Sequence, residues 1–244
     1  ASASFPKAGG SVGDTFKKIY LDKLDLKANS KISSYIIKNY IEPNLPKFWY
    51  FDEYNTLPQH ISIQKLKNKT IDNDCTKAQL EIVEAFFNLA AIDVSKLLVD
   101  NNHEAYIAEL EATSNSISDN FSNYWSTNKN LEIAFDIEQK QNEKYLNVRI
   151  KNTKHRVTLP LNNRSKGFIW FLSFFVWFSK IRDQSNVIIL LDEPGLNLHA
   201  EAQSDLLRYI EEQLASKYQV LYTTHSPFMI DPSKLFEVRT AYDS

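Results

Sequence analysis

The feature that most constrains the fold is an uninterrupted run of five aliphatic residues, VIILL at positions 187–191. Such a run is typical of a central parallel strand, because a strand of this kind is buried on both faces of its sheet. A helical pattern over 202–214 and a second apolar run at 220–222 follow it. The alternation of strand and helix predicts an α/β fold with a parallel sheet at its core.

The rest of the chain is predicted to add flanking β segments and a helical insertion. The β-prone and alternating stretches that predict strands are 47–54, 60–66, 131–137, 145–150 and 155–160. Thr76 and Gln79 have the spacing of a capping box, and helical patterns cover 76–92 and 103–125. Because the apolar stripe of the second helix is narrow, we expect the two helices to pack on each other as a hairpin rather than on the sheet.

These patterns divide the chain into three parts. Residues 1–15 are small, polar and glycine-rich, so we expect a linker or a cloning-derived segment there. Residues 16–75 and 131–244 form the predicted α/β lobe, and residues 76–130 form the helical insertion.

Composition argues against several classes of protein. The chain has 28 Lys and Arg against 30 Asp and Glu, so no overall basic field favours nucleic acid or anionic lipid. One cysteine, Cys75, and no secretory signal pattern predict a cytoplasmic location. The apolar run at 168–181 is shorter than the roughly 20 residues that cross a bilayer. We interpret it as a buried helix and expect no membrane partner.

Two adjacent carboxylates, Asp192 and Glu193, directly follow the strand at 187–191. Open α/β sheets bind ligands at the carboxyl ends of their strands. Asp192 offers the hard oxygen ligands that Mg²⁺ prefers, and Glu193 is then free to act as general base on an attacking water. The alternative is an acidic pair on an ordinary surface, but its place after five buried aliphatic residues favours the functional interpretation.

His225 stands at the end of the next apolar run. A neighbouring parallel strand would bring its imidazole beside Glu193, where it could hydrogen-bond a γ-phosphate or the attacking water. Alternatively, His225 only caps the turn that begins at Ser226 and Pro227. The acidic pair on the preceding strand favours the first interpretation.

A third candidate element is the start of the apolar helix, where Arg164, Ser165, Lys166 and Gly167 form a potential anion site. A plain serine cap beside solvated cations explains the same residues. The five glycines of the chain do not form the phosphate-binding loop G-x-x-x-x-G-K-[ST], and "GGSVGDTF" at 9–16 lacks its lysine. We therefore expect this chain alone to be inactive on nucleotides.

Taken in chain order, these motifs resemble the C-terminal half of ABC-type ATPase heads. More closely, "LPKFWYFDEY", "RSKGFIWFLSFF", "LLDEPGLNLHAEAQSDLLRYIEEQL" and "VLYTTHSPFMID" resemble the ATPase part of the overcoming-lysogenization-defect (OLD) family of ATP-dependent endonucleases. The resemblance implies Walker B roles for Asp192 and Glu193, a switch role for His225 and a signature role for residues 165–167. It also implies a D-loop at 194–199 that includes Asn197 and His199.

The same resemblance implies cofactors, partners and further segments. ATP and Mg²⁺ would be bound at head-to-head interfaces of a homodimer, with residues 76–130 as a dimerisation or DNA-facing arm. In the family, a Walker A loop precedes this region and a Toprim nuclease domain usually follows it. The sequence departs from the family pattern at the signature, which reads Arg164-Ser165-Lys166-Gly167-Phe168, and at the D-loop aspartate, which is His199.

Two alternatives stay open from the sequence. The chain could be a non-hydrolysing interaction module, a half-head that pairs with a separate P-loop subunit. It could also be a metal-dependent hydrolase that uses Asp192, Glu193 and His225 directly, although their positions at strand ends match nucleotide switching better than a closed metal shell.

Overall fold

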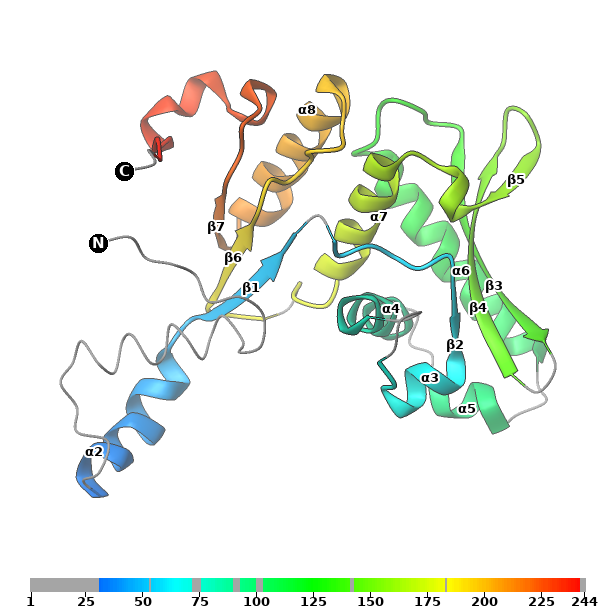
Figure 1. Ribbon diagram of the computed structural model, residues 1–244, viewed down its shortest axis with the longest axis horizontal. Coiled ribbons are helices and arrows are strands. Elements are labelled where there is room, and N and C mark those ends of the chain that lie inside the picture. Colours follow the sequence, from blue (N-terminus) through cyan, green and yellow to red (C-terminus); the bar gives the residue numbers. More distant parts are fainter. Residues whose placement is uncertain are drawn as a thin grey trace.

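The computed structural model describes residues 31–241 except 53, 72–75, 90–92, 100–102, 141–142 and 183. The linker predicted at 1–15 and Cys75 lie outside the described residues. Figure 1 shows two sheets with helices between them. One sheet is parallel and the other antiparallel, so the α/β class with flanking β segments is confirmed.

The parallel sheet has the strand order β1-β6-β7. It consists of β1 (Lys47–Phe51), β6 (Val187–Leu191) and β7 (Gln219–Tyr222). Both pairings are parallel, with Phe51 opposite Leu191 and Leu191 opposite Tyr222. The five aliphatic residues therefore form the central strand, as predicted from their uninterrupted hydrophobicity.

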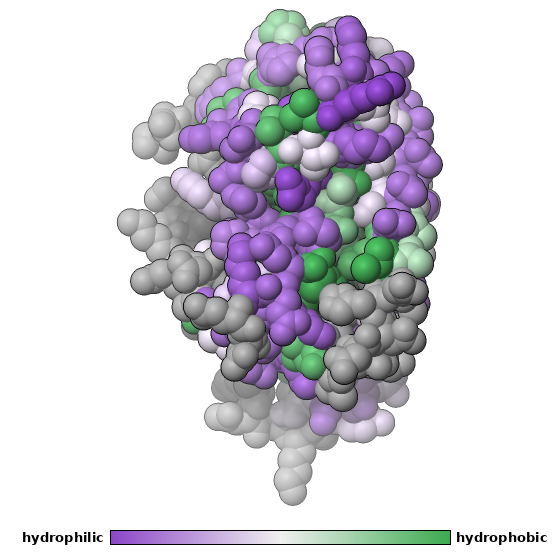
Figure 2. All heavy atoms as spheres, turned by 90° about the vertical axis from the view of Figure 1, so that its right-hand side faces the viewer, coloured by the Kyte–Doolittle hydropathy of each residue, from purple (hydrophilic) through white to green (hydrophobic). Residues whose placement is uncertain are grey.

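The antiparallel sheet has the order β2-β4-β3, with β5 also paired to β4. Its strands are β2 (His60–Ser62), β3 (Leu131–Lys140), β4 (Glu143–Asn152) and β5 (Val157–Pro160). Burial alternates along β3 and β4, as expected when one face packs on a core and the other meets solvent. Figure 2 looks at this side of the molecule and shows a mainly hydrophilic surface.

Helices connect and separate the two sheets. The first helix in the described part of the chain is α2 (Lys31–Ile36). It continues as a π-helical turn over Ile37–Ile41 and a 3-10 turn over Glu42–Asn44. The other helices are α3 (Ile63–Asn68), α4 (Lys77–Leu89), α5 (Val94–Val99), α6 (His103–Ser122), α7 (Lys166–Phe178) and α8 (Ala200–Tyr209). A π-helical turn over Ile210–Ala215 extends α8, and short 3-10 turns lie at Leu161–Asn163, Pro227–Met229 and Pro232–Glu237.

The predicted capping box opens α4. The Thr76 backbone N–H donates to Gln79 Oε1 at 3.0 Å, and the Gln79 N–H donates to Thr76 Oγ1 at 3.2 Å. These reciprocal bonds satisfy two backbone donors that a helix start leaves free. The start of the first helix in the insertion is therefore confirmed.

Aromatic packing between α7 and the parallel sheet forms the centre of the core. The ring of Phe51 lies 5.7 Å from Trp170, 5.2 Å from Phe174 and 4.8 Å from Trp177, measured between centroids. Most of α7 is buried, which confirms the buried helix predicted from the apolar run. In the part of the chain that the structure describes, no helix is both long and apolar enough to cross a membrane.

The predicted packing of the two insertion helices on each other is wrong. Helix α6 packs on strand β3, and α4 packs on α7. Two serines of α6 explain this choice, because their hydroxyls accept hydrogen bonds from an edge strand: Ser118 Oγ from the Ile133 N–H at 2.8 Å and Ser114 Oγ from the Phe135 N–H at 3.2 Å. Covering the edge in this way satisfies donors that would otherwise be free. The narrow apolar stripe of α6 is buried accordingly.

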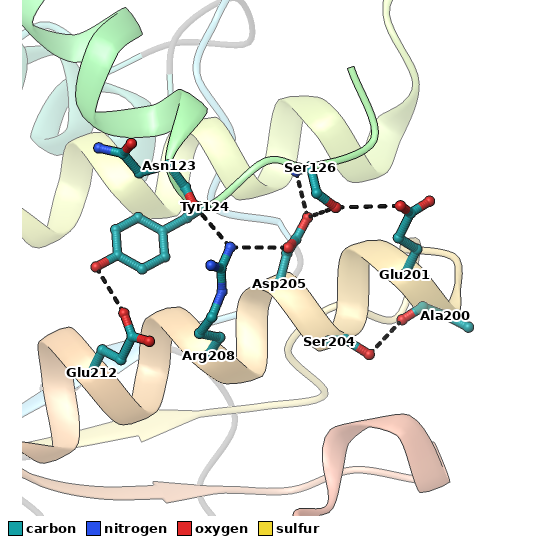
Figure 3. Close-up of polar contacts among 9 residues, drawn as sticks. All are labelled: Asn123, Tyr124, Ser126, Ala200, Glu201, Ser204, Asp205, Arg208 and Glu212. Atoms are coloured by element: carbon teal, nitrogen blue, oxygen red, sulfur yellow. Dashed lines mark hydrogen bonds and ion pairs between the residues drawn. The ribbon is translucent and has the colours of Figure 1, made fainter. Parts of the chain in front are cut away.

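A polar network joins the end of α6 to α8, and Figure 3 shows its members. Asp205 is buried on α8, and its Oδ2 accepts from the Ser126 backbone N–H at 2.6 Å and from Ser126 Oγ at 2.8 Å. Arg208 Nη2 lies 3.2 Å from Asp205 Oδ1 and donates to the Asn123 carbonyl at 2.8 Å. The network therefore fixes the segment that follows α6, at the end of the insertion, to the helix that follows β6.

This arrangement predicts that Asp205→Ala lowers the free energy of unfolding by about 1–3 kcal/mol, because it leaves the donors of Ser126 and Arg208 without their acceptor. Urea unfolding followed by circular dichroism measures the change. Ser204→Ala is the matched control, since Ser204 is exposed and its hydroxyl bonds only the Ala200 carbonyl of its own helix. Equal stabilities of the two variants would contradict the role given to Asp205.

Candidate functional site

The carboxyl ends of β6 and β7 place the candidate residues side by side. Asp192 and Glu193 leave β6, while Thr223 and His225 leave β7, which is its direct parallel neighbour. The Thr223 N–H donates to the Leu191 carbonyl at 3.1 Å and extends the pairing by one step past β7. The predicted meeting of the acidic pair with His225 is therefore observed.

Asp192 is held by hydroxyl groups from both neighbouring strands. Thr223 Oγ1 donates to its Oδ1 at 2.7 Å, and the Tyr50 phenol on β1 donates to its Oδ2 at 3.1 Å. Partial burial and the Asp192 carboxylate raise the pKa of Tyr50 to about 12, so the phenol is protonated and can donate at neutral pH. Asp192 itself is exposed, and its oriented oxygens remain accessible.

Glu193 has a left-handed backbone with φ of 46°, an uncommon conformation for a residue other than glycine. Its N–H donates to Thr223 Oγ1 at 3.0 Å, so one threonine hydroxyl serves both carboxylate residues. Local strain of this kind often accompanies functional positions. Here it turns the Glu193 side chain towards the loop that follows β7.

The Glu193 carboxylate meets His225 through both of its oxygens. The His225 backbone N–H donates to Oε2 at 3.3 Å, and His225 Nε2 lies 3.2 Å from Oε1. The side chain of His225 is 93% exposed and that of Glu193 is 25% exposed. The pair therefore lies at the surface, where both groups can reach a bound molecule.

The start of α7 packs tightly on the loop after β6. A Cβ on Gly167 would lie 2.5 Å from the Asn197 carbonyl oxygen and 2.7 Å from Leu198 Cδ2. This close approach gives Gly167 a packing role, while its predicted role in nucleotide binding stays a prediction. Gly167, Glu193 and Asn197 line one shallow depression together with Trp170, Gly195, Leu196 and Leu198.

The other residues of the predicted signature lie at the N-terminus of α7. Ser165 caps the helix by accepting the Phe168 N–H at 3.3 Å, and Lys166 is exposed. The guanidinium carbon of Arg164 lies 5.5 Å from the centroid of the Phe168 ring, a cation–π geometry. Its buried Nε has no hydrogen-bond partner among the residues that the structure describes. His199 caps α8 by its backbone and has an exposed side chain. None of these four residues lines the depression beside Glu193.

Three residues at or near the strand ends were missed by the sequence analysis. Tyr50 and Thr223 orient Asp192, and Gln203 hydrogen-bonds the Gly195 carbonyl and the Ser226 hydroxyl. Tyr50 is 142 positions from Asp192, and no local pattern pairs β1 with β6. The two threonines before His225 were the available signal for Thr223.

The carboxylate oxygens of Asp192 fit a Mg²⁺ ion whose remaining ligands are water molecules and substrate phosphates. Mg²⁺ retains several waters and is usually held by one or two carboxylates plus substrate phosphates. Over the described residues, no three His, Cys, Asp or Glu side chains are grouped closely enough to hold a metal ion. The alternative of a metal-dependent hydrolase with a closed protein shell therefore lacks support in this part of the chain.

Solved structures similar to this chain include two Smc head domains. One, from Pyrococcus furiosus and bound to the C-terminal domain of ScpA, is 16% identical with a TM-score of 0.36 and aligns 68% of this chain with 49% of its own. The other, bound to the C-winged helix domain of ScpA, is 15% identical with a TM-score of 0.39, and the shares are 82% and 53%.

Sequence comparison finds a relative and a family. Uncharacterized protein MJECL43 of Methanocaldococcus jannaschii is 32% identical over 131 residues, which cover 49% of this chain and 32% of that protein. The chain thus matches about a third of the length of this relative. The AAA ATPase domain family matches residues 10–230, which is most of the sequence. The chain therefore belongs to the AAA ATPase domain family.

Proposed function

We propose that this chain is the C-terminal portion of an ABC-class ATPase head and supplies the residues that hydrolyse ATP. The observation that carries the proposal is the contact between Glu193 and His225, next to an Asp192 oriented by two hydroxyls, at the edge of a parallel sheet. Membership of the AAA ATPase domain family supports ATP as the nucleotide.

Each strand-end residue has a distinct role in the proposed reaction. Asp192 holds Mg²⁺ through carboxylate oxygens that Thr223 and Tyr50 keep in place. The ion supplies charge stabilisation to the phosphates when it is bound. Glu193 accepts a proton from the attacking water, and His225 holds the Glu193 carboxylate and hydrogen-bonds the water or the γ-phosphate. Asp192 and Glu193 thus form the Walker B pair, and His225 is the switch residue.

Arg164, Ser165 and Lys166 are proposed to act in trans, on nucleotide held by a second copy of the chain. Within one copy they lie at the start of α7 and outside the depression that contains Glu193. The positive end of a helix and two cations attract a γ-phosphate from an opposing surface. Gly167, Asn197 and His199 are proposed as further nucleotide contacts, and the active form is proposed to be a head-to-head homodimer.

The wider role follows from the OLD-family resemblance. We propose that the complete protein couples ATP hydrolysis to DNA processing through a Toprim nuclease domain, in the cytoplasm, in a role such as phage defence. Residues 76–130 then serve as a dimerisation or DNA-facing arm. Because the chain has 28 Lys and Arg against 30 Asp and Glu, the proposed DNA contact would need a local basic surface or another part of the protein.

One face of the parallel sheet carries partly exposed side chains, which fits the leading proposal and the half-head alternative equally. Helix α7 packs on the side of the parallel sheet that carries Trp49 and Phe51. On the opposite side, Tyr50 and Leu221 are 41% and 48% exposed. Parallel sheets are normally covered on both faces. We propose that a further structural layer, which contains the phosphate-binding loop, covers the face of the sheet that carries Tyr50 and Leu221. Either the same polypeptide or a separate subunit would provide that layer.

In the complete natural protein, Glu193→Gln is expected to retain ATP binding and to reduce kcat by about 10²–10⁴-fold, because the amide keeps the size of the side chain but cannot accept a proton. Asp192→Asn is expected instead to weaken Mg²⁺-dependent binding. Steady-state hydrolysis and calorimetric ATP titration measure the two effects. Glu237→Gln, an exposed carboxylate elsewhere, serves as control. Equal and small effects at 192 and 193 would assign the pair a structural role.

The trans arrangement is tested with heterodimers purified through two different tags, in which one subunit carries Ser165→Arg and the other Glu193→Gln. If the signature acts in trans, both changes fall on one composite site, and the intact second site keeps about half of the wild-type hydrolysis rate. If it acts in cis, each subunit damages its own site and hydrolysis is lost. Loss of hydrolysis in the heterodimer therefore contradicts the proposal.

A further inference from the structure

Gln203 is a buried polar residue in the first turns of α8, with 7% of its surface exposed. Its Nε2 donates to the Gly195 carbonyl at 3.0 Å, and its Oε1 accepts from Ser226 Oγ at 2.6 Å. Both ends of the amide are thus used, as expected for a buried polar group. One side chain consequently joins the loop after β6 to the loop after β7.

Each anchor point is close in sequence to a proposed catalytic residue. Gly195 is two residues after Glu193, and both have positive φ, 78° and 46°. Ser226 directly follows His225 and begins a 3-10 turn by accepting the Phe228 N–H at 3.3 Å. Fixing Gly195 and Ser226 therefore restricts the backbone on the C-terminal side of both Glu193 and His225.

Among the described residues, the hydrogen bonds and ion pairs that directly join the two loops are few and lie at the exposed ends of the loops. Apart from the Thr223 hydroxyl, the described contacts are those of His225 with the Glu193 carboxylate, and the imidazole is nearly fully exposed. The amide of Gln203 connects the loops from the buried side, on a helix that is itself fixed to Ser126 through Asp205. The Gln203 side chain therefore limits, from the buried side, how far the loop after β6 can shift relative to the loop after β7.

We propose that Gln203 is a positioning residue that holds Glu193 and His225 in the relative arrangement needed for hydrolysis. This inference rests on the proposed function. A displacement of about 1 Å between reacting groups can cost about 10²-fold in rate even when the mutated residue is remote from the chemistry. Binding of nucleotide depends on other residues, so removing the connection affects kcat more than KM.

The variants follow from the two hydrogen bonds. Gln203→Met keeps the length of the side chain and removes both bonds. Ser226→Ala removes one of them together with the bond that Ser226 Oγ accepts from the Phe228 N–H, while Ser226→Thr retains the hydroxyl. Gln213→Met is the matched control, because Gln213 belongs to the π-helical extension of α8 and donates to the Tyr124 phenol at 2.6 Å, away from both loops.

Two measurements are made. The first is hydrogen–deuterium exchange of this chain, followed in peptides that contain the Leu198 N–H, which bonds the Gly195 carbonyl, and the His225 N–H. The second is steady-state ATP hydrolysis by the complete natural protein. We expect Gln203→Met to accelerate exchange in both loops and to lower kcat about 10- to 100-fold, with KM for ATP within about two-fold. Ser226→Ala is expected to act in the same direction, the double variant to be no worse than Gln203→Met, and Ser226→Thr to behave as wild type.

Several results would overturn the inference. A kcat for Gln203→Met equal to that of Gln213→Met contradicts it, with or without faster exchange. A lower kcat without faster exchange contradicts the mechanism of loop fixation, and a raised KM with unchanged kcat assigns Gln203 to nucleotide binding. The proposed function fails separately, if Glu193→Gln leaves hydrolysis by the complete protein unchanged. If the proposed function fails in this way, hydrogen–deuterium exchange still tests the structural part of the inference. Exchange in Gln203→Met equal to wild type would then show that Gln203 does not hold the two loops together.

Discussion

Parallel pairing of β6 with β7 is the interaction on which the candidate site depends. It sets Leu191 opposite Tyr222, so the residues that leave the two strands emerge at one edge. The hydroxyl of Thr223 then bridges Asp192 and the Glu193 backbone, and His225 reaches the Glu193 carboxylate. A shift of one residue in this register would send these side chains to opposite faces. The chemistry proposed for the chain is thus a consequence of strand alignment.

Two helices keep that edge in place from the buried side. Helix α7 packs its aromatic residues on Phe51 and carries Gly167 in its first turn, where the loop after β6 leaves no space for a side chain. Helix α8 carries Gln203 towards both loops and Asp205 towards Ser126. The candidate signature, the acidic pair and the insertion are consequently parts of one packed unit, although they are far apart in the sequence.

Local pattern predicted the elements of the fold better than their packing. The aliphatic run, the capping box at Thr76 and the apolar helix at 168–181 were recognised because each depends on neighbouring residues. The pairing of β1 with β6 and the contacts of Tyr50 were not recognised, since they join residues about 140 positions apart. The packing of α6 was predicted wrongly, because two serines that bond the edge of β3 look like ordinary polar positions in a sequence. In the site, Asp192, Glu193 and His225 were found from strand ends, whereas Gln203 gives no local signal.

The central claim is that the edge formed by β6 and β7 is a site of ATP hydrolysis. A crystal structure of the complete natural protein with Mg²⁺ and a non-hydrolysable ATP analogue tests it most directly. The account predicts the metal ion beside Asp192, the γ-phosphate within reach of Glu193 and His225, and the start of α7 from a second copy facing the same phosphate. Nucleotide bound elsewhere, with the Glu193–His225 pair remote from the phosphates, would contradict the account.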